Sequence, residues 1–416
     1  MKNRKISIIL GLFLICFSLT NENGVAQAQS KMVKKVHSTA FELSDGDRVV
    51  FLGNSLFEND LQYGYLELAL TTSWPLRDVT YRNLGWSGDT VFGEARTYIT
   101  APSGYDLLIK QLKESRPTVV FVAYGSNEAF EKEEGLPVFV QGLNKLLNEI
   151  DELGARAILL SPVPMMLPES SRYEINRNSM LELYTNAISK IAGERGIRFI
   201  DIFKPLLEFN KNTKLSYNGL HLNESGYYVL ANIILERLGL LSNNKRSIQI
   251  DVSKPSIKGT VRANILELEE NKESLNFRID EEYLPLPLPQ GDFIPVDNKL
   301  KLKIDGLKNG SYALSSVGYE IITASAEEWK KGVAVRQGTA FDQANKLREK
   351  IIKKNELFFY QYRPLNRTYI IGFRSHEQGR HAQGLEDLGD VITSLEEQIA
   401  LGRIPDSQIY QLRPIR

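Results

Sequence analysis

The sequence predicts an α/β fold in which a parallel sheet lies between two layers of helices, followed by a small β module and a helical C-terminal segment. Between residues 48 and 241, short apolar runs alternate with longer helical stretches, which is typical of βαβ units. These runs are apolar on both faces, as expected when helices cover both sides of a sheet. Beyond residue 241 the pattern changes to short alternating segments and then returns to long helical stretches.

The expected parallel sheet has one strand for each apolar run. These strands are Arg48–Leu52, Val79–Asn83, Thr118–Ala123, Ala155–Leu160 and Arg198–Ile202. The expected helices between and after them are Gly64–Thr72, Gly104–Glu114, Pro137–Leu153, Asn178–Arg195 and Glu224–Leu238. Ligands of such sheets bind outside the carboxyl ends of the strands, so the loops that follow the strands are the places to search for chemistry.

The second half of the chain is expected to form two further parts. Residues 245–322 carry short β-patterned segments separated by turns, which predicts a small antiparallel module resembling a β-sandwich. Its expected strands are Ser247–Val252, Thr260–Leu268, Ser274–Ile279, Leu300–Ile304 and Ser311–Val317. Residues 325–416 are expected to be helical and to pack on the first domain, residues 40–241, with long helices at about Asp342–Phe359 and Leu388–Leu401.

The first 28 residues have the three parts of a secretory signal peptide. Three basic residues lie within the first five, residues 6–19 are apolar, and Ala26-Gln27-Ala28 supplies an A-x-A cleavage site. The apolar run is shorter than the roughly 18 residues that a spanning helix needs, which argues against a retained membrane anchor. Ile15, where a lipoprotein signal requires a small residue, argues against lipid attachment at Cys16. We therefore expect an exported protein, periplasmic or secreted, with no stable membrane insertion after cleavage.

Composition limits the classes of partner. The 51 Lys+Arg balance 51 Asp+Glu, whereas nucleic-acid-binding proteins favour a strongly basic face, so we expect no nucleic-acid partner. The single Cys and four His show no spacing that resembles a zinc site. The sequence therefore predicts no metal and no organic cofactor.

Four polar blocks follow expected strands or precede the last helix of the first domain. They are Gly53–Ser55, Asn83–Thr90, Gly125–Glu128 and Asn218–His221. Each block alone is most simply a turn, a cap or a structural residue. Together, in this chain order, they offer a serine, glycine main-chain N–H groups, a carboxamide and a histidine. A nucleophile, a base and oxyanion donors are what acyl transfer requires.

The same four blocks resemble those of the SGNH/GDSL hydrolase superfamily of esterases and lipases. The resemblance covers about residues 49–240 and implies a flavodoxin-like, three-layer α/β/α sheet of the SGNH type. It places Ser55 at the nucleophile, His221 at the base, and the Ser55 and Gly88 N–H groups with the Asn127 side chain in the oxyanion hole. The sequence is similar to an exported bacterial branch with Gly-Asn-Ser and Asn-Gly-x-His blocks and a C-terminal extension.

Three positions depart from the superfamily pattern. Asn54 stands where Gly-Asp-Ser has Asp, and Glu128 stands where the third block usually has Asp. The larger change is Asn218, which replaces the carboxylate that orients the histidine, since His221 then loses the charge that stabilises its imidazolium. In a serine protease the equivalent replacement lowers kcat about 10⁴-fold.

Three interpretations of Asn218 remain open. His221 is oriented by the Asn218 amide or by the backbone and forms a dyad with Ser55, or a carboxylate from Asp89, Glu128 or Asp201 substitutes, or the pocket binds without turnover. Because the protein is expected to be exported, the expected substrate is a small-molecule or glycan ester, with a carbohydrate acetyl ester as the example. The alternative function is a catalytically weak or inactive SGNH-fold protein that binds carbohydrate or another ligand.

Overall fold

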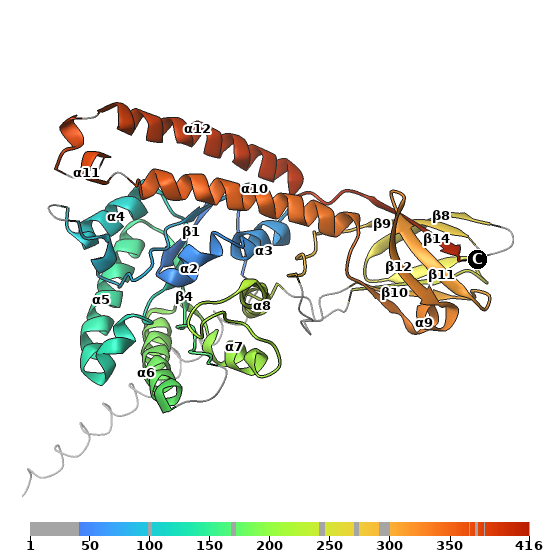
Figure 1. Cartoon of the computed structure of the whole chain (residues 1–416), viewed down its shortest axis with the longest axis horizontal. Coiled ribbons are helices and arrows are strands. Elements are labelled where there is room, and N and C mark those ends of the chain that lie inside the picture. The colour runs from blue at the N-terminus through green and yellow to red at the C-terminus, as the bar shows by residue number, and fades with distance from the viewer. Residues whose placement is uncertain are drawn as a thin grey trace, which may run out of the picture.

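The computed structural model describes residues 41–98, 102–167, 172–240, 246–269, 274–290, 300–365, 367–370, 373–377 and 379–415. The predicted signal peptide lies outside these residues, so export stays a prediction. Within them, no helix is long and apolar enough to cross a membrane. Figure 1 shows an α/β domain joined to a β module, with two long helices lying along the α/β domain.

The α/β domain is built on a five-stranded parallel sheet in the order β2-β1-β3-β4-β5. Its strands are β1 (Asp47–Gly53), β2 (Val79–Asn83), β3 (Val119–Ala123), β4 (Arg156–Leu160) and β5 (Arg198–Ile200). The predicted fold class is therefore confirmed. The strand order reverses at β1, so the loops after β1 and β3 diverge at a crevice where ligands bind in such sheets. Gly53 is required there, because a Cβ atom on it would lie 2.5 Å from the Ala123 carbonyl oxygen.

Helices cover both faces of this sheet over two apolar cores. One core takes side chains from α3 (Tyr65–Ser73) and α8 (Glu224–Arg237), and the other takes side chains from α4 (Gly104–Glu114), α5 (Lys132–Glu152) and α6 (Arg172–Arg195). The shorter helical elements of the domain are α2 (Ser55–Asp60), η1 (Glu94–Arg96), η2 (Glu128–Glu131) and α7 (Phe203–Asn210). The sequence did not predict α2 and α7, which are too short to show a helical period.

The β module consists of two sheets packed face to face. One has the order β13-β10-β6-β7 and the other β12-β11-β14-β9-β8. The strands are β6 (Ser247–Asp251), β7 (Ser256–Gly259), β8 (Arg262–Leu268), β9 (Leu275–Asp280), β10 (Leu300–Asp305), β11 (Ser311–Ser316), β12 (Tyr319–Ser325), β13 (Val333–Val335) and β14 (Gln408–Pro414), with the short helix α9 (Ala326–Lys331) before β13. One pair, β6 with β10, is parallel, whereas the sequence led us to expect an antiparallel module.

The last strand corrects the expectation that residues 325–416 are helical. In the structure β14 lies between β9 and β11, in the middle of its sheet. Its buried residues alternate, with Gln408, Tyr410 and Leu412 facing the sandwich core. The alternation of buried and exposed residues typical of a strand was present in the sequence, but the partners of β14 lie more than 90 positions earlier, so no local pattern predicted the pairing.

The two long helices form a hairpin that lies along the α/β domain, and both ends of this hairpin connect to the β module (Figure 1). They are α10 (Thr339–Tyr362) and α12 (Gly379–Gly402), and the segment between them contains α11 (Arg367–Ile370) and η3 (Ser375–Glu377). Lys354 of α10 is buried and its Nζ lies 2.7 Å from Glu67 Oε1 of α3 and 3.0 Å from the Tyr81 carbonyl oxygen. Burial raises the pKa of Glu67 and lowers that of Lys354, and the ion pair opposes both shifts. These contacts connect α10 to both α3 and β2 of the α/β domain.

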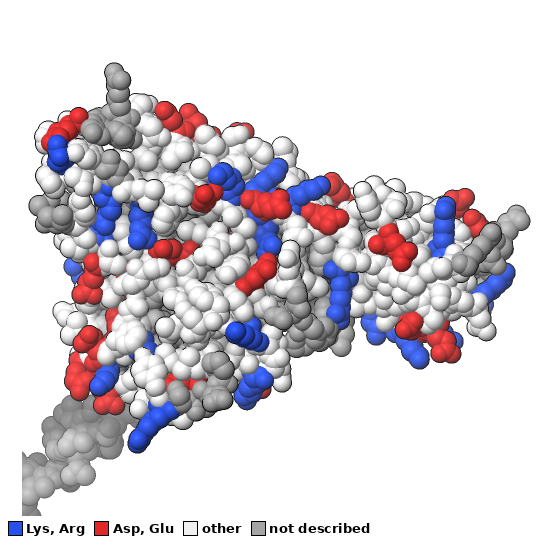
Figure 2. Space-filling model, in the orientation of Figure 1, with Lys and Arg blue, Asp and Glu red and all other residues white. Residues whose placement is uncertain are grey.

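The surface carries both signs of charge. Figure 2 shows Lys and Arg interspersed with Asp and Glu over the face in view, on the α/β domain as well as on the β module. This mixture agrees with the formal net charge of zero.

Candidate active site

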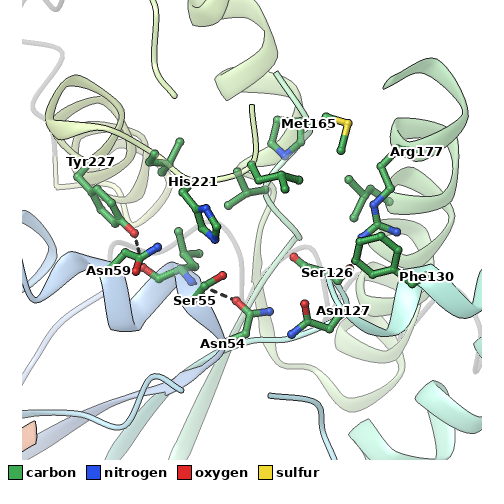
Figure 3. Close-up of a pocket in the computed structure, with 16 residues that line it drawn as sticks. Asn54, Ser55, Asn59, Ser126, Asn127, Phe130, Met165, Arg177, His221 and Tyr227 are labelled. Atoms are coloured by element: carbon green, nitrogen blue, oxygen red, sulfur yellow. Dashed lines mark hydrogen bonds between the residues drawn. The ribbon is translucent and has the colours of Figure 1, made fainter. Parts of the chain in front are cut away.

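A pocket of about 110 Å³ opens at the carboxyl edge of the parallel sheet. Residues from separate loops line it: Asn54 and Ser55 after β1, Ser126 and Asn127 after β3, Val163 to Met165 after β4, and Leu220 to Leu222 before α8. Figure 3 shows His221 above Ser55, with Asn127 beside them. The structure therefore brings together the serine, the carboxamide and the histidine that the sequence singled out.

Ser55 is the first residue of α2, directly after β1. The Asn54 side chain caps this helix, because its Oδ1 accepts a hydrogen bond of 3.2 Å from the Leu56 N–H. Tyr227 also donates to the Leu56 carbonyl oxygen at 2.6 Å, which ties the first turn of α2 to α8. Within the described residues the Ser55 N–H has no acceptor, so this donor stays available to an oxyanion.

Asn127 is placed to donate into the pocket. Its Nδ2 donates one hydrogen bond of 2.7 Å to the Asp89 carbonyl oxygen, which leaves the second N–H of the amide free. Gly88, the other expected oxyanion donor, has φ +81°, a left-handed conformation that favours glycine. Gly88 is exposed and is not among the residues that line the pocket, although its neighbour Asp89 binds Asn127. Of the three expected donors, two line the pocket and Gly88 lies beside it.

Asn218 contacts the Nδ1 atom of His221, but with the polarity opposite to that of an aspartate. Its Oδ1 accepts from the N–H groups of Leu220 (3.0 Å) and His221 (2.8 Å). Its Nδ2 lies 3.0 Å from His221 Nδ1. Turning the amide over would set its NH₂ group against two backbone donors, so the NH₂ group donates to Nδ1. The proton of the neutral ring then sits on Nε2.

This polarity matters because a general base must accept the serine proton on a free ring nitrogen. The sequence allowed Asn218 Oδ1 to accept from an Nδ1–H group, whereas in the structure that oxygen is occupied by the backbone. The tautomer with a free Nε2 would place its Nδ1–H against the Asn218 NH₂ group, and so would the imidazolium. The site therefore places His221 in the same pocket as Ser55 but favours the tautomer that does not accept a proton from Ser55. The Tyr217 ring stacks on the imidazole, with the ring centroids 5.7 Å apart.

Asp89, the first candidate for a carboxylate that could orient His221, binds Arg96 and Tyr124 instead. Its Oδ2 lies 2.7 Å from Arg96 Nε and accepts a hydrogen bond of 3.1 Å from the Tyr124 hydroxyl. Burial raises the pKa of Asp89, and the Arg96 guanidinium opposes that shift. This buried cluster holds the loop after β2, and Asp89 makes no contact with His221.

Glu128 and Asp201, the other two candidates, also bind elsewhere. The Glu128 carboxylate accepts from the N–H groups of Val91 (2.9 Å) and Gly125 (2.8 Å), joining the loops after β2 and β3. Burial raises the pKa of Glu128 to about 7. Asp201 Oδ1 accepts from the Phe203 N–H at 3.0 Å, at the start of α7. None of the three carboxylates orients the histidine in this structure.

The C-terminal helices reach the loop that carries Gly88 through contacts that the sequence did not specify. The Tyr362 hydroxyl at the end of α10 donates to the Gly85 carbonyl oxygen at 2.6 Å. The next residue, Arg363, stacks on Trp86 at 4.1 Å from the ring centroid and binds Glu58 of α2 at 2.8 Å. No local pattern marks such residues, because the contacts join parts of the chain about 280 positions apart. Among the described residues no cluster of His, Cys, Asp and Glu could hold a metal ion.

Comparison with known proteins relates part of the chain to one family. Residues 51–229 match the model of the GDSL-like Lipase/Acylhydrolase family. No curated protein matches the sequence. Among solved structures, a gut microbial diltiazem-metabolizing enzyme, BT4096, is 18% identical with a TM-score of 0.68, over 91% of this chain and 100% of that chain. The acetylxylan esterase Axe2 from Geobacillus stearothermophilus is 19% identical with a TM-score of 0.39, over 49% of this chain and 100% of that chain.

The likeness to BT4096 concerns the fold. Because it covers 91% of the chain, it extends beyond residues 51–229 into the β module and the helical hairpin. The arrangement of all three parts is therefore shared with a solved structure, although the two sequences have diverged to 18% identity.

Proposed function

Residues 51–229 belong to the GDSL-like lipase/acylhydrolase family, so the chain is a hydrolase acting on ester bonds, and we propose that it is an exported serine esterase that uses Ser55 and His221. The observation that carries the proposal is that Ser55, Asn127 and His221 line one pocket, although they lie far apart in the sequence. Polar residues of three loops converge on this pocket, in which an ester carbonyl would lie between a nucleophile and an oxyanion donor.

In the proposed reaction the Ser55 hydroxyl attacks the ester carbonyl. His221 takes the serine proton on Nε2, in the minority tautomer that carries its other proton on Nδ1, and returns it to the departing alcohol. The Ser55 and Gly88 N–H groups and the Asn127 amide hold the oxyanion. Water activated by His221 then releases the acyl group from Ser55. Because Asn218 favours the other tautomer, proton transfer to His221 carries the cost of reaching the minority tautomer.

The size of the pocket supports a small acyl group. A volume of about 110 Å³ lies well below the roughly 300–1,000 Å³ of pockets that take drug-sized ligands, which supports a short acyl group such as acetyl. Export supports an extracellular glycan as the carrier of that acyl group. The proposed substrate is therefore a short-chain ester, with a carbohydrate acetyl ester as the main example.

One observation favours the second candidate function, a weakly active or inactive protein that binds a carbohydrate or another ligand in the same pocket. It is the donation of the Asn218 NH₂ group to His221 Nδ1, which disfavours both the base and the imidazolium. The two functions differ in whether the Ser55 hydroxyl is nucleophilic.

Hydrolysis of p-nitrophenyl acetate and labelling by a fluorophosphonate separate the two. We expect both to occur in the mature protein and to be lost in Ser55→Ala. Ser126→Ala is the matched control, because Ser126 lines the same pocket and is not the proposed nucleophile. If Ser55→Ala keeps the rate and the labelling of the unmodified protein, Ser55 is not the nucleophile. If no serine-dependent reaction occurs on activated esters or on acetylated glycans, the binding function replaces the esterase.

A further inference from the structure

A buried arginine lines the same pocket as the proposed nucleophile. Arg177 projects from α6 into the pocket wall and is only 8% exposed. Figure 3 shows it next to Phe130, on the side of the pocket away from His221. Its Nη2 donates to the Ser126 carbonyl oxygen, whereas its buried Nε has no hydrogen-bond partner among the described residues.

Arg177 also lacks a counter-charge within the part of the chain that the structure describes. Its titratable neighbours are the phenols of Tyr173 and Tyr184, and burial lowers its pKa. The guanidinium carbon lies 3.6 Å from the Phe130 ring centroid, and this cation–π contact offsets only part of the lost hydration. A charge buried without an anion is costly, so the fold keeps an unfavourable group at this place.

Comparison with the other buried cations shows that this is unusual for the molecule. Among the described residues three Lys and Arg side chains are buried: Arg96, Arg177 and Lys354. Arg96 pairs with Asp89 and Lys354 pairs with Glu67. Of these three, Arg177 is the cation that has no carboxylate partner among the described residues, and it lines the pocket.

We propose that Arg177 binds a carboxylate of the substrate, so that the preferred substrates are esters carrying a second, ionised carboxyl group near the ester bond. This inference rests on the proposed esterase function of the same pocket. A guanidinium presents N–H groups in a planar fork that matches the two oxygens of a carboxylate. The carboxylate supplies the counter-charge that Arg177 lacks among the described residues. It belongs either to the acyl part, as in a half-ester of a dicarboxylic acid, or to the alcohol part, as in an acylated acidic sugar.

Two matched pairs of substrates distinguish these sources. For the acyl part, p-nitrophenyl hemisuccinate is compared with p-nitrophenyl pentanoate, which has a similar length and no charge. For the alcohol part, 4-acetoxybenzoate is compared with 4-acetoxybenzamide. We expect one charged member to have the higher kcat/KM. In Arg177→Met the ratio of kcat/KM between the charged and the neutral substrate should fall about 10- to 100-fold through a higher KM for the charged one, as expected for a lost charged hydrogen bond. The kcat/KM of the neutral substrate should change less than about threefold.

Two further variants test for a merely structural role. Arg177→Lys keeps the charge but not the planar fork, so it should retain part of the preference. Lys190 lies on the same helix in an exposed ion pair, so Lys190→Met should leave the preference for the charged substrate unchanged. Equal kcat/KM for both members of both pairs, or an undiminished preference in Arg177→Met, overturns the proposal.

Binding without turnover separates this proposal from the esterase function. Calorimetry with Ser55→Ala and monomethyl succinate should detect binding that weakens at least tenfold in Ser55→Ala/Arg177→Met, with methyl butyrate as the neutral probe. Serine-independent rates together with Arg177-dependent binding reject the esterase and keep the carboxylate site. Serine-dependent rates with no Arg177-dependent binding or preference keep the esterase and reject the site.

Discussion

Replacement of Asn218 by Asp tests the polarity of the contact to His221 most directly. An aspartate of the same shape keeps one oxygen on the N–H groups of Leu220 and His221, which now lie at 3.0 and 2.8 Å. Its second oxygen takes the place of the NH₂ group, 3.0 Å from Nδ1, and accepts the Nδ1–H that the amide repels. The ring then carries a free Nε2 facing the pocket, and its imidazolium gains a counter-charge.

The expected gain follows from the contacts. A hydrogen bond to a charged group contributes about 1.5–3 kcal/mol, and about 1.4 kcal/mol changes a rate tenfold, so kcat should rise about 10- to 100-fold. This is less than the ~10⁴-fold difference in a serine protease, where the carboxylate is buried. Asn218 is exposed, and water screens a charge placed there.

The assay is kcat on p-nitrophenyl acetate for the mature protein, Asn218→Asp and the double variant Ser55→Ala/Asn218→Asp. The double variant should lose the gain, because the base acts only through the serine. Asn218→Ala, which removes the amide and adds no charge, should gain less than Asn218→Asp. If Asn218→Asp folds normally and its kcat is unchanged or lower, the asparagine is part of a working site and the tautomer argument is wrong.

Three other predictions concern the support of the site. Glu67→Gln should lower the free energy of unfolding in urea by about 3–5 kcal/mol, because it leaves Lys354 buried without its counter-charge, whereas Lys190→Met in an exposed pair should change it by less than about 0.5 kcal/mol. The pKa of Glu128 is raised from 4.5 to about 7, so the protonated side chain stabilises the folded state fully below about pH 4.5. This contribution to the free energy of unfolding should decline by up to about 3 kcal/mol as the pH rises to 7. Urea unfolding from pH 4.5 to 8 should show this decline in the unmodified protein, and Glu128→Gln, which does not ionise, should lack it. Tyr362→Phe removes the hydrogen bond to the Gly85 carbonyl oxygen, so it should lower the free energy of unfolding by about 1 kcal/mol and lower kcat several-fold with little change in KM. Tyr360→Phe on the same helix should be neutral. An unchanged kcat in Tyr362→Phe means that the loop holds Gly88 without α10.

The residues that could be predicted from the sequence are those whose position follows from a strand. Ser55 and Asn127 come directly after β1 and β3, and the carboxyl ends of adjacent parallel strands meet at one edge, so their proximity was predictable. His221 was found through its block, which precedes α8. In each case a local pattern and a general rule of sheet topology were enough.

The residues that could not be predicted depend on distant partners. Arg177 is one of many charged residues on a helix, and such residues are mostly exposed, so nothing local marked it as buried. The polarity of Asn218 depends on which backbone N–H groups face its oxygen, which only the folded loop decides. Tyr362 and Arg363 contact a loop that the chain built hundreds of residues earlier, and β14 pairs with strands from before the hairpin.

The position of β14 also sets an order of events in folding. Gln408 pairs with Ile279, 129 positions earlier, and β14 lies between two strands that must leave a gap until it inserts. Pairings of such long sequence separation form slowly, because the chain must close a large loop before any contact compensates the lost entropy. The helical hairpin is the last part of that loop, and it is tethered to the sandwich at both ends only after β14 has inserted. The contacts of α10 with the loop of Gly88 therefore mature late, so during refolding the recovery of hydrolysis should lag behind the formation of the parallel sheet.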